Sequence, residues 1–171
     1  MVAVNDLYAN EVSTLVQRLG QILSAAGYKL VTAESCTGGG IAKICTEFAG
    51  SSAWFECGWV TYSNQSKQDL LGVAPQILFE YGAVSEATVM AMAQGALNRS
   101  QAQVAIAVSG IAGPDGGTAS KPVGTVCIAV VIKARLARAQ TYYFQGQRAQ
   151  VREQAVFEAL QWVEHLLTQE P

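Results

Sequence analysis

The stretch QVAIAVS, residues 103–109, decides the fold class, because its apolar residues follow one another directly instead of alternating with polar ones. A strand with one face in water alternates apolar and polar side chains, whereas a strand covered on both faces does not. We therefore predict a central strand in a sheet that carries helices on both faces.

Patterns on either side of this strand predict the remaining elements. β-Branched and aromatic runs predict further strands at 28–33, 57–62, 123–132 and 138–145. Apolar residues at helical spacing predict helices at 10–26, 41–48, 64–71, 75–81, 85–97 and 148–167. This order predicts one three-layer α/β/α domain over residues 1–171, with a mixed, mostly parallel five-stranded sheet. The last two strands are close enough in sequence to form an antiparallel hairpin.

Composition excludes several classes of function. The 171 residues are 50% hydrophobic, enough for one core, and the net charge of −2 with scattered Lys and Arg argues against a nucleic-acid partner. The four cysteines have no CxxC spacing and there is one histidine, so we expect reduced thiols and no metal site. The longest apolar run, 126–132, is too short to span a membrane, and the first residues do not resemble a signal peptide. We therefore expect a soluble, cytoplasmic protein that has no membrane partner.

The stretch TAESCTGGG, residues 32–40, is the first candidate site. It joins a predicted strand to a predicted helix, which is where open α/β sheets bind ligands. The amides of Cys36, Thr37, Gly38 and Gly39 would be available to an oxyanion or a phosphate. A simpler interpretation, which the pattern leaves open, makes Thr37 a helix cap and the glycines a tight strand–helix contact. The spacing fits neither the P-loop motif nor the GxSxG motif.

A serine nucleophile at Ser35 would need a base, because its hydroxyl is protonated at neutral pH. The single histidine, His165, lies on the predicted last helix, where we expect a structural or solvent-facing role. In VTYSNQSK, residues 60–67, Lys67 falls in the first turn of a helix capped by Ser63 or Asn64, where the helix dipole favours a neutral amine.

Lys67 would also need burial, because its pKa must fall from about 10.4 toward about 7. Tyr62, five residues upstream, is a candidate to relay or donate a proton. The competing interpretation is a solvated surface lysine and a packed tyrosine.

A third loop, SGIAGPDGGTASKPVG at residues 109–124, follows the central strand. Ser109 and the amides of Gly110 and Gly113 could wrap an anionic group. Asp115 or Lys121 could contact a polar part of a ligand. The same residues also suit a plain turn. Arg148, at the start of the last helix, would hold a phosphate or be an ordinary surface charge.

Four blocks resemble the CinA C-terminal domain family, and in the same order: TAESCTGG, GSSAWFECGWVTYSNQSKQDLLGV, GAVSEATV and VSGIAGPDGGTASKPVGTV. The resemblance covers about residues 10 to 165. Stand-alone members of this family are nicotinamide-nucleotide amidases. The resemblance therefore implies hydrolysis of nicotinamide mononucleotide to nicotinate mononucleotide and ammonia, a step of pyridine-nucleotide salvage, with no cofactor.

The same resemblance assigns roles to individual residues. It implies Ser35 as nucleophile, Lys67 as base and Tyr62 as the assisting residue, with the Cys36 amide as oxyanion donor. Thr37, Gly38, Asn64, Ser109, Gly110, Gly113 and Arg148 complete the expected oxyanion and substrate contacts. It also implies at least a homodimer. Many relatives carry an N-terminal pyrophosphatase-like domain that has no counterpart here, so we assign none of its activity.

Two alternatives stay open. One places Cys36 in the attacking role, because a thiol at a helix start can have a lowered pKa. The other is a non-catalytic nucleotide- or partner-binding module, which would keep the glycine loops without needing a buried lysine.

Overall fold

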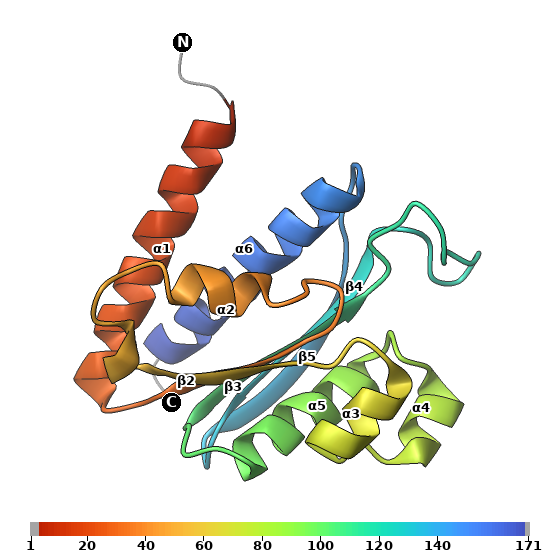
Figure 1. The fold of residues 1–171 in the computed structure, drawn as a ribbon, viewed down its shortest axis with the longest axis horizontal. Helices are drawn as coiled ribbons and strands as arrows, with labels where there is room; N and C mark the ends of the chain where they lie inside the picture. Colours follow the sequence, from red (N-terminus) through yellow and green to blue (C-terminus); the bar gives the residue numbers. More distant parts are fainter. Residues whose placement is uncertain (1–3, 170–171) are drawn as a thin grey trace.

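The computed structural model describes the backbone of residues 4–169 and the side chains of residues 8–169 (Figure 1). The ends of the predicted domain, residues 1–3 and 170–171, lie outside this range. The elements in chain order are α1 (Val4–Ala26), β1 (Leu30–Glu34), α2 (Gly40–Cys45), the short 3-10 helix η1 (Ser51–Ala53), β2 (Phe55–Val60), α3 (Asn64–Leu71), α4 (Pro75–Tyr81), α5 (Glu86–Asn98), β3 (Val104–Gly110), β4 (Thr125–Ile132), β5 (Leu136–Tyr143) and α6 (Arg148–Thr168).

The strands form one five-stranded sheet in the order β2-β1-β3-β4-β5. β1 runs parallel to both β2 and β3, whereas β4 is antiparallel to β3 and to β5. Four strands therefore share one direction and β4 opposes them. The predicted mixed sheet and its closing hairpin are confirmed.

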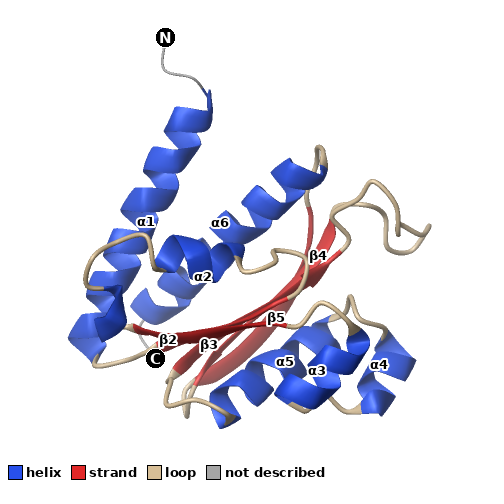
Figure 2. Cartoon of the chain, in the orientation of Figure 1, coloured by secondary structure: helices blue, strands red, loops and turns tan. Residues whose placement is uncertain are grey.

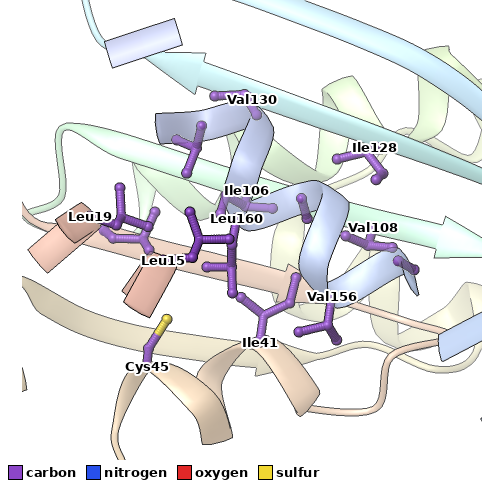
Figure 3. Close-up of a cluster of buried hydrophobic side chains, with 14 of the residues drawn as sticks. Leu15, Leu19, Ile41, Cys45, Ile106, Val108, Ile128, Val130, Val156 and Leu160 are labelled. Atoms are coloured by element: carbon purple, nitrogen blue, oxygen red, sulfur yellow. The ribbon is translucent and has the colours of Figure 1, made fainter. Parts of the chain in front are cut away.

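Helices cover both faces of the sheet, as the unbroken apolar run of the central strand predicted. The helices α1, α2 and α6 lie on one side and α3, α4 and α5 on the other (Figures 1 and 2). On β3, Val104, Ile106 and Val108 join the core on the α1 side, whereas Ala105 and Ala107 join the core on the α5 side. Figure 3 shows the first of these cores, where residues of β3 and β4 gather with residues of α1, α2 and α6.

Small residues let the helices of the second face pack closely. A Cβ atom at Gly95 of α5 would lie 1.9 Å from the carbonyl oxygen of Leu71, the last residue of α3. Any side chain at this position would force α3 away from α5. Gly95 thus fixes the position of the helix that carries Lys67.

Element boundaries differ from the predictions at several ends. α1 begins at Val4 instead of residue 10, and α2 ends at Cys45 instead of 48. β2 covers Phe55–Val60 instead of 57–62, because its partner β1 pairs from Leu30 to Glu34 only. β5 begins at Leu136, since a tight turn in which Arg135 N–H donates to the Ile132 carbonyl closes the hairpin early. None of the described helices combines the length and apolar character needed to cross a membrane.

Candidate active site

Three loops meet at one edge of the sheet because β1, β2 and β3 run parallel. Their carboxyl ends lie at the same edge, where open α/β sheets bind ligands. The loops that follow these strands are residues 35–39, 61–63 and 111–124. Two of the three loops lie within bonding distance of the side chain of Lys67, which projects from the first turn of α3.

Lys67 and Ser35 are in direct contact. The Nζ atom of Lys67 lies 3.1 Å from Ser35 Oγ, and Lys67 is only 1% exposed. Ser35 is held at the end of β1, where its N–H donates to the Val108 carbonyl at 2.9 Å. The interpretation of Lys67 as a solvated surface residue is therefore wrong.

The surroundings of Lys67 favour its neutral form. Nζ donates to the main-chain carbonyls of Thr61, at 2.8 Å, and of Tyr62, at 3.3 Å. In the described part of the chain no carboxylate forms an ion pair with it. Burial therefore lowers the pKa of Lys67, opposed in part by the charge that Cys36 carries when ionised. A neutral amine has two N–H groups, which the two carbonyls take, so its lone pair is left to accept the proton of Ser35 Oγ.

Ser63 caps the helix that carries Lys67. Ser63 precedes α3 and its Oγ accepts the N–H of Ser66 at 3.0 Å. Asn64 is the first residue of α3 and is exposed, so Ser63, not Asn64, is the cap. Lys67 lies in the first turn, as predicted.

The loop after β1 is stabilised by a buried carboxylate. Glu34, 0% exposed, accepts the Thr37 hydroxyl at 2.7 Å and the amides of Ile41, at 3.1 Å, and Ala42, at 2.9 Å. The negative charge therefore lies at the start of α2, where the helix dipole stabilises it. The interpretation of Thr37 as the helix cap is wrong, because Gly39 precedes α2 and Thr37 bonds Glu34 instead.

Glycines let this loop turn sharply. Gly38 and Gly39 have φ values of +61° and +88°, in the left-handed region that other residues avoid. Arg152 of α6 holds the loop from the other side, donating from Nε to the Cys36 carbonyl and from Nη2 to the Thr37 carbonyl.

Arg148 and Tyr62 lie together beside the third loop. Arg148 is the first residue of α6, and its Nη1 donates to the Gly113 carbonyl at 2.9 Å while Nη2 donates to the Tyr62 hydroxyl at 3.3 Å. The Tyr62 side chain is 65% exposed, and the bonds of its hydroxyl in the described region do not include Lys67 or Ser35. The structure thus brings the Tyr62 carbonyl, not its hydroxyl, to the lysine.

Other predicted residues of the third loop are engaged in packing. The Ser109 hydroxyl donates to the Ala83 carbonyl at 2.7 Å, and Ser109 is 2% exposed. A Cβ atom at Gly110 would lie 2.6 Å from Val126 Cγ2, and one at Gly113 would lie 2.6 Å from Val123 Cγ1. Asp115 is exposed, whereas the Lys121 ammonium donates to the carbonyls of Tyr81 and Val84.

Cys36 and His165 are poorly placed for chemistry. Cys36 is 6% exposed, and burial raises the pKa of its thiol to about 12, so it is protonated at neutral pH. His165 is exposed and contacts Gln169. It lies 13 positions beyond Arg152, or about 20 Å along α6. No group of three His, Cys, Asp or Glu side chains suited to a metal ion gathers within residues 8–169.

Two residues that shape the site, Glu34 and Arg152, are not among the residues predicted from the sequence. Glu34 lies within TAESCTGGG, and an acid placed between a strand and a helix start is a recognisable signal. Arg152 lies four residues after Arg148, so the helical spacing alone places both on one face of α6. What the spacing does not reveal is which loop that face meets.

The family model of the CinA C-terminal domain matches residues 12–167, most of the chain. This chain belongs to the CinA C-terminal domain family. It is 49% identical over 152 residues to a protein of Escherichia coli (strain K12) named nicotinamide-nucleotide amidohydrolase PncC, covering 89% of this chain and 92% of that protein. It is 51% identical over 150 residues to a protein of Pseudomonas putida with the same name, covering 87% and 92%.

A longer relative and a solved structure are also similar to most of this chain. The chain is 50% identical over 169 residues to a protein of Symbiobacterium thermophilum, covering 94% of this chain but only 40% of that relative. The crystal structure of the competence/damage inducible protein CihA from Agrobacterium tumefaciens matches with a TM-score of 0.89 and 43% identity, covering 93% of this chain and 96% of that one. The domain thus occurs both in proteins of similar length and as part of longer ones.

Proposed function

We propose that this protein is an amidase that hydrolyses the carboxamide of nicotinamide mononucleotide, giving nicotinate mononucleotide and ammonia. The observation that carries the chemistry is the buried Nζ atom of Lys67 at 3.1 Å from Ser35 Oγ, with the carbonyls of Thr61 and Tyr62 also within bonding distance of Nζ. The names of the relatives from Escherichia coli and Pseudomonas putida supply the substrate.

In the proposed reaction, Lys67 acts as general base. Its neutral amine takes the proton of Ser35 as Oγ attacks the carboxamide carbon, and the carbonyl oxygen becomes an oxyanion. Main-chain amides of Cys36 and Thr37 stabilise this charge, each donor contributing about 100- to 1000-fold in rate. Protonated Lys67 then gives its proton to the departing nitrogen, and ammonia leaves.

Water completes the cycle by the same proton path. Lys67 removes a proton from water as the water oxygen attacks the ester carbon. The bond from that carbon to Ser35 Oγ then breaks, Oγ takes the proton back from Lys67, and the carboxylate leaves. Tyr62 assists through its carbonyl, which orients the lysine, while its hydroxyl accepts a hydrogen bond from Arg148. The Arg148 guanidinium is the proposed phosphate contact, because the Gly38 amide already donates to the Ser35 carbonyl and the Ile111 amide to the Thr125 carbonyl. Asn64 lies exposed at the start of α3. The place in salvage, the homodimer and the cytoplasmic location stay predictions.

Ammonia release from nicotinamide mononucleotide by the EDTA-treated protein tests the proposal. Ser35→Ala and Lys67→Met should each lower kcat by at least about 1000-fold. Ser52→Ala and Lys133→Met are matched controls and should keep wild-type rates, since both residues are exposed and lie outside the three loops of the site. Near-normal turnover in Ser35→Ala would remove the serine mechanism. Tight mononucleotide binding by calorimetry without turnover in the wild type would instead indicate a binding module.

A further inference from the structure

Arg152 reaches the loop of Ser35 from one helical turn beyond Arg148. Its Nε donates to the Cys36 carbonyl at 3.1 Å, and its Nη2 donates to the Thr37 carbonyl at 3.0 Å. A guanidinium has its N–H groups in a rigid planar fork, which suits two neighbouring carbonyls, whereas a lysine ammonium does not. The two bonds therefore fix the orientation of two successive peptide groups.

Because the peptide bonds are trans, the contacts of Arg152 with carbonyls also set the direction of the neighbouring N–H groups. In a trans peptide the N–H points opposite to the C=O of the same group. The Cys36 carbonyl and the Thr37 N–H share one peptide group, so a carbonyl that faces Arg152 directs the Thr37 N–H away from it. The Cys36 N–H is fixed in the same way, because the Ser35 carbonyl accepts the Gly38 N–H at 3.0 Å.

These two amides, next to Ser35, are left for a ligand. Of the amides that follow, Gly38 donates to the Ser35 carbonyl and Gly40 to the Thr37 carbonyl, whereas Gly39 donates to no acceptor in the described residues. Neither the Cys36 N–H nor the Thr37 N–H donates to an acceptor among residues 8–169. The Thr37 hydroxyl is held by Glu34, so the residue is held through both its side chain and its carbonyl.

We propose that Arg152 is a positioning residue that holds the Cys36–Thr37 peptide so that the Thr37 N–H donates to the oxyanion formed on Ser35. This inference rests on the proposed amidase function. Arg152 touches neither the substrate nor the reacting atoms, and it acts only through the carbonyls that it holds.

A competing role, direct binding of the substrate phosphate by Arg152, predicts a different kinetic pattern. An oxyanion donor acts mainly in the transition state, so disturbing it lowers kcat with little change in KM. A lost phosphate contact weakens substrate binding and raises KM. Comparing kcat with KM therefore distinguishes the two roles.

The first experiment measures kcat and KM on nicotinamide mononucleotide for Arg152→Ala and Arg152→Lys. We expect kcat to fall by roughly 100-fold in both variants, with KM changed by less than about threefold. Added methylguanidinium should restore a measurable part of kcat in Arg152→Ala but not in Arg152→Lys, where the lysine side chain fills the site. A rise in KM at unchanged kcat would overturn the inference.

Arg135→Ala is the matched control. Arg135 also donates to two main-chain carbonyls, those of Leu167 and Gln169, but at the opposite end of α6. This variant should keep wild-type kcat and KM, and methylguanidinium should not alter them. Thermal unfolding of all variants shows whether each is folded under assay conditions.

A second readout does not depend on the substrate. A fluorophosphonate forms a bond from phosphorus to Ser35 Oγ and expels fluoride, while the serine proton passes to Lys67 and negative charge grows on the phosphoryl oxygen. Mass spectrometry should show slower labelling of Ser35 in Arg152→Ala, with rescue by methylguanidinium, and wild-type labelling in Arg135→Ala.

The two readouts separate the two hypotheses. A wild-type protein that is labelled but releases no ammonia would refute the proposed substrate and leave the labelling test of Arg152 in force. Labelling of Arg152→Ala at the wild-type rate would overturn the positioning role. A wild-type protein that shows neither reaction would overturn both.

Discussion

The Nζ atom of Lys67 lies 3.1 Å from the Oγ atom of Ser35, although 32 residues separate them in the chain. The contact joins the first turn of α3 to the loop after β1, and it is buried from solvent. A buried amine beside a hydroxyl, without a carboxylate partner in the described region, is suited to accept a proton.

Replacing Lys67 by arginine tests the need for a neutral base. The guanidinium stays protonated at any working pH, so Lys67→Arg should lower kcat by at least about 100-fold. In the wild type, burial lowers the pKa of Lys67, so kcat/KM should rise with pH through that lowered pKa and then level off. Steady-state kinetics across pH measure both effects. An activity that falls as pH rises through this range would contradict the assignment.

Replacing Lys67 by methionine should change how stability depends on pH. The unfolded lysine keeps its ordinary pKa of 10.5, whereas the folded one is lower, so between these two values the unfolded state binds more protons. Stability of the wild type therefore rises with pH in this window, by up to about 1.4 kcal/mol per pH unit. We expect Lys67→Met to have a higher free energy of unfolding than the wild type, by more at about pH 7 than at about pH 10. Urea unfolding at the two pH values measures this difference. Equal differences at both pH values would rule out a depressed pKa.

Replacing Cys36 by alanine separates the thiol from the serine. Because burial raises the thiol pKa to about 12, we expect Cys36→Ala to retain most of the wild-type kcat, and iodoacetamide to label Cys36 slowly in the folded protein. Ammonia release measures kcat of the variant, and mass spectrometry measures the rate at which iodoacetamide labels Cys36. If Cys36→Ala is inactive while Ser35→Ala is active, the nucleophile is Cys36.

Replacing Glu34 by alanine tests the buried carboxylate that stabilises the loop. The change leaves the Thr37 hydroxyl and the amides of Ile41 and Ala42 without their acceptor. Because each unsatisfied buried donor costs about 1–3 kcal/mol, we expect Glu34→Ala to lower the free energy of unfolding by about 3 kcal/mol or more. Glu34→Gln, which keeps one acceptor oxygen, should lose less.

A partly exposed carboxylate provides the control for Glu34. Glu56 pairs with Lys29 at 2.8 Å, their side chains are 23% and 42% exposed, and Glu56→Ala should cost less than about 1 kcal/mol. Denaturant unfolding measures all three variants. Similar losses in Glu34→Ala and Glu56→Ala would show that Glu34 is not a structural anchor.

The sequence by itself determined the layers of this fold. An apolar run such as that of β3 can be stable only when both of its faces are covered, and the order of helices and strands then leaves few arrangements. The same local signals identified Ser35 at a strand end and Lys67 in a first helical turn, because glycine loops and helix starts depend on residues close in sequence. Strand ends were predicted less well, because the length of β2 depends on where its neighbour β1 ends.

Only the tertiary structure decided what surrounds these residues. The burial of Lys67 depends on Thr61, Tyr62 and the packing of α3 against α5, which no local pattern contains. The contacts of Arg152 with the Ser35 loop join positions more than 110 residues apart. Sequence patterns report which side chains can do chemistry, but the pKa of an amine and the direction of an amide depend on neighbours that only folding brings together.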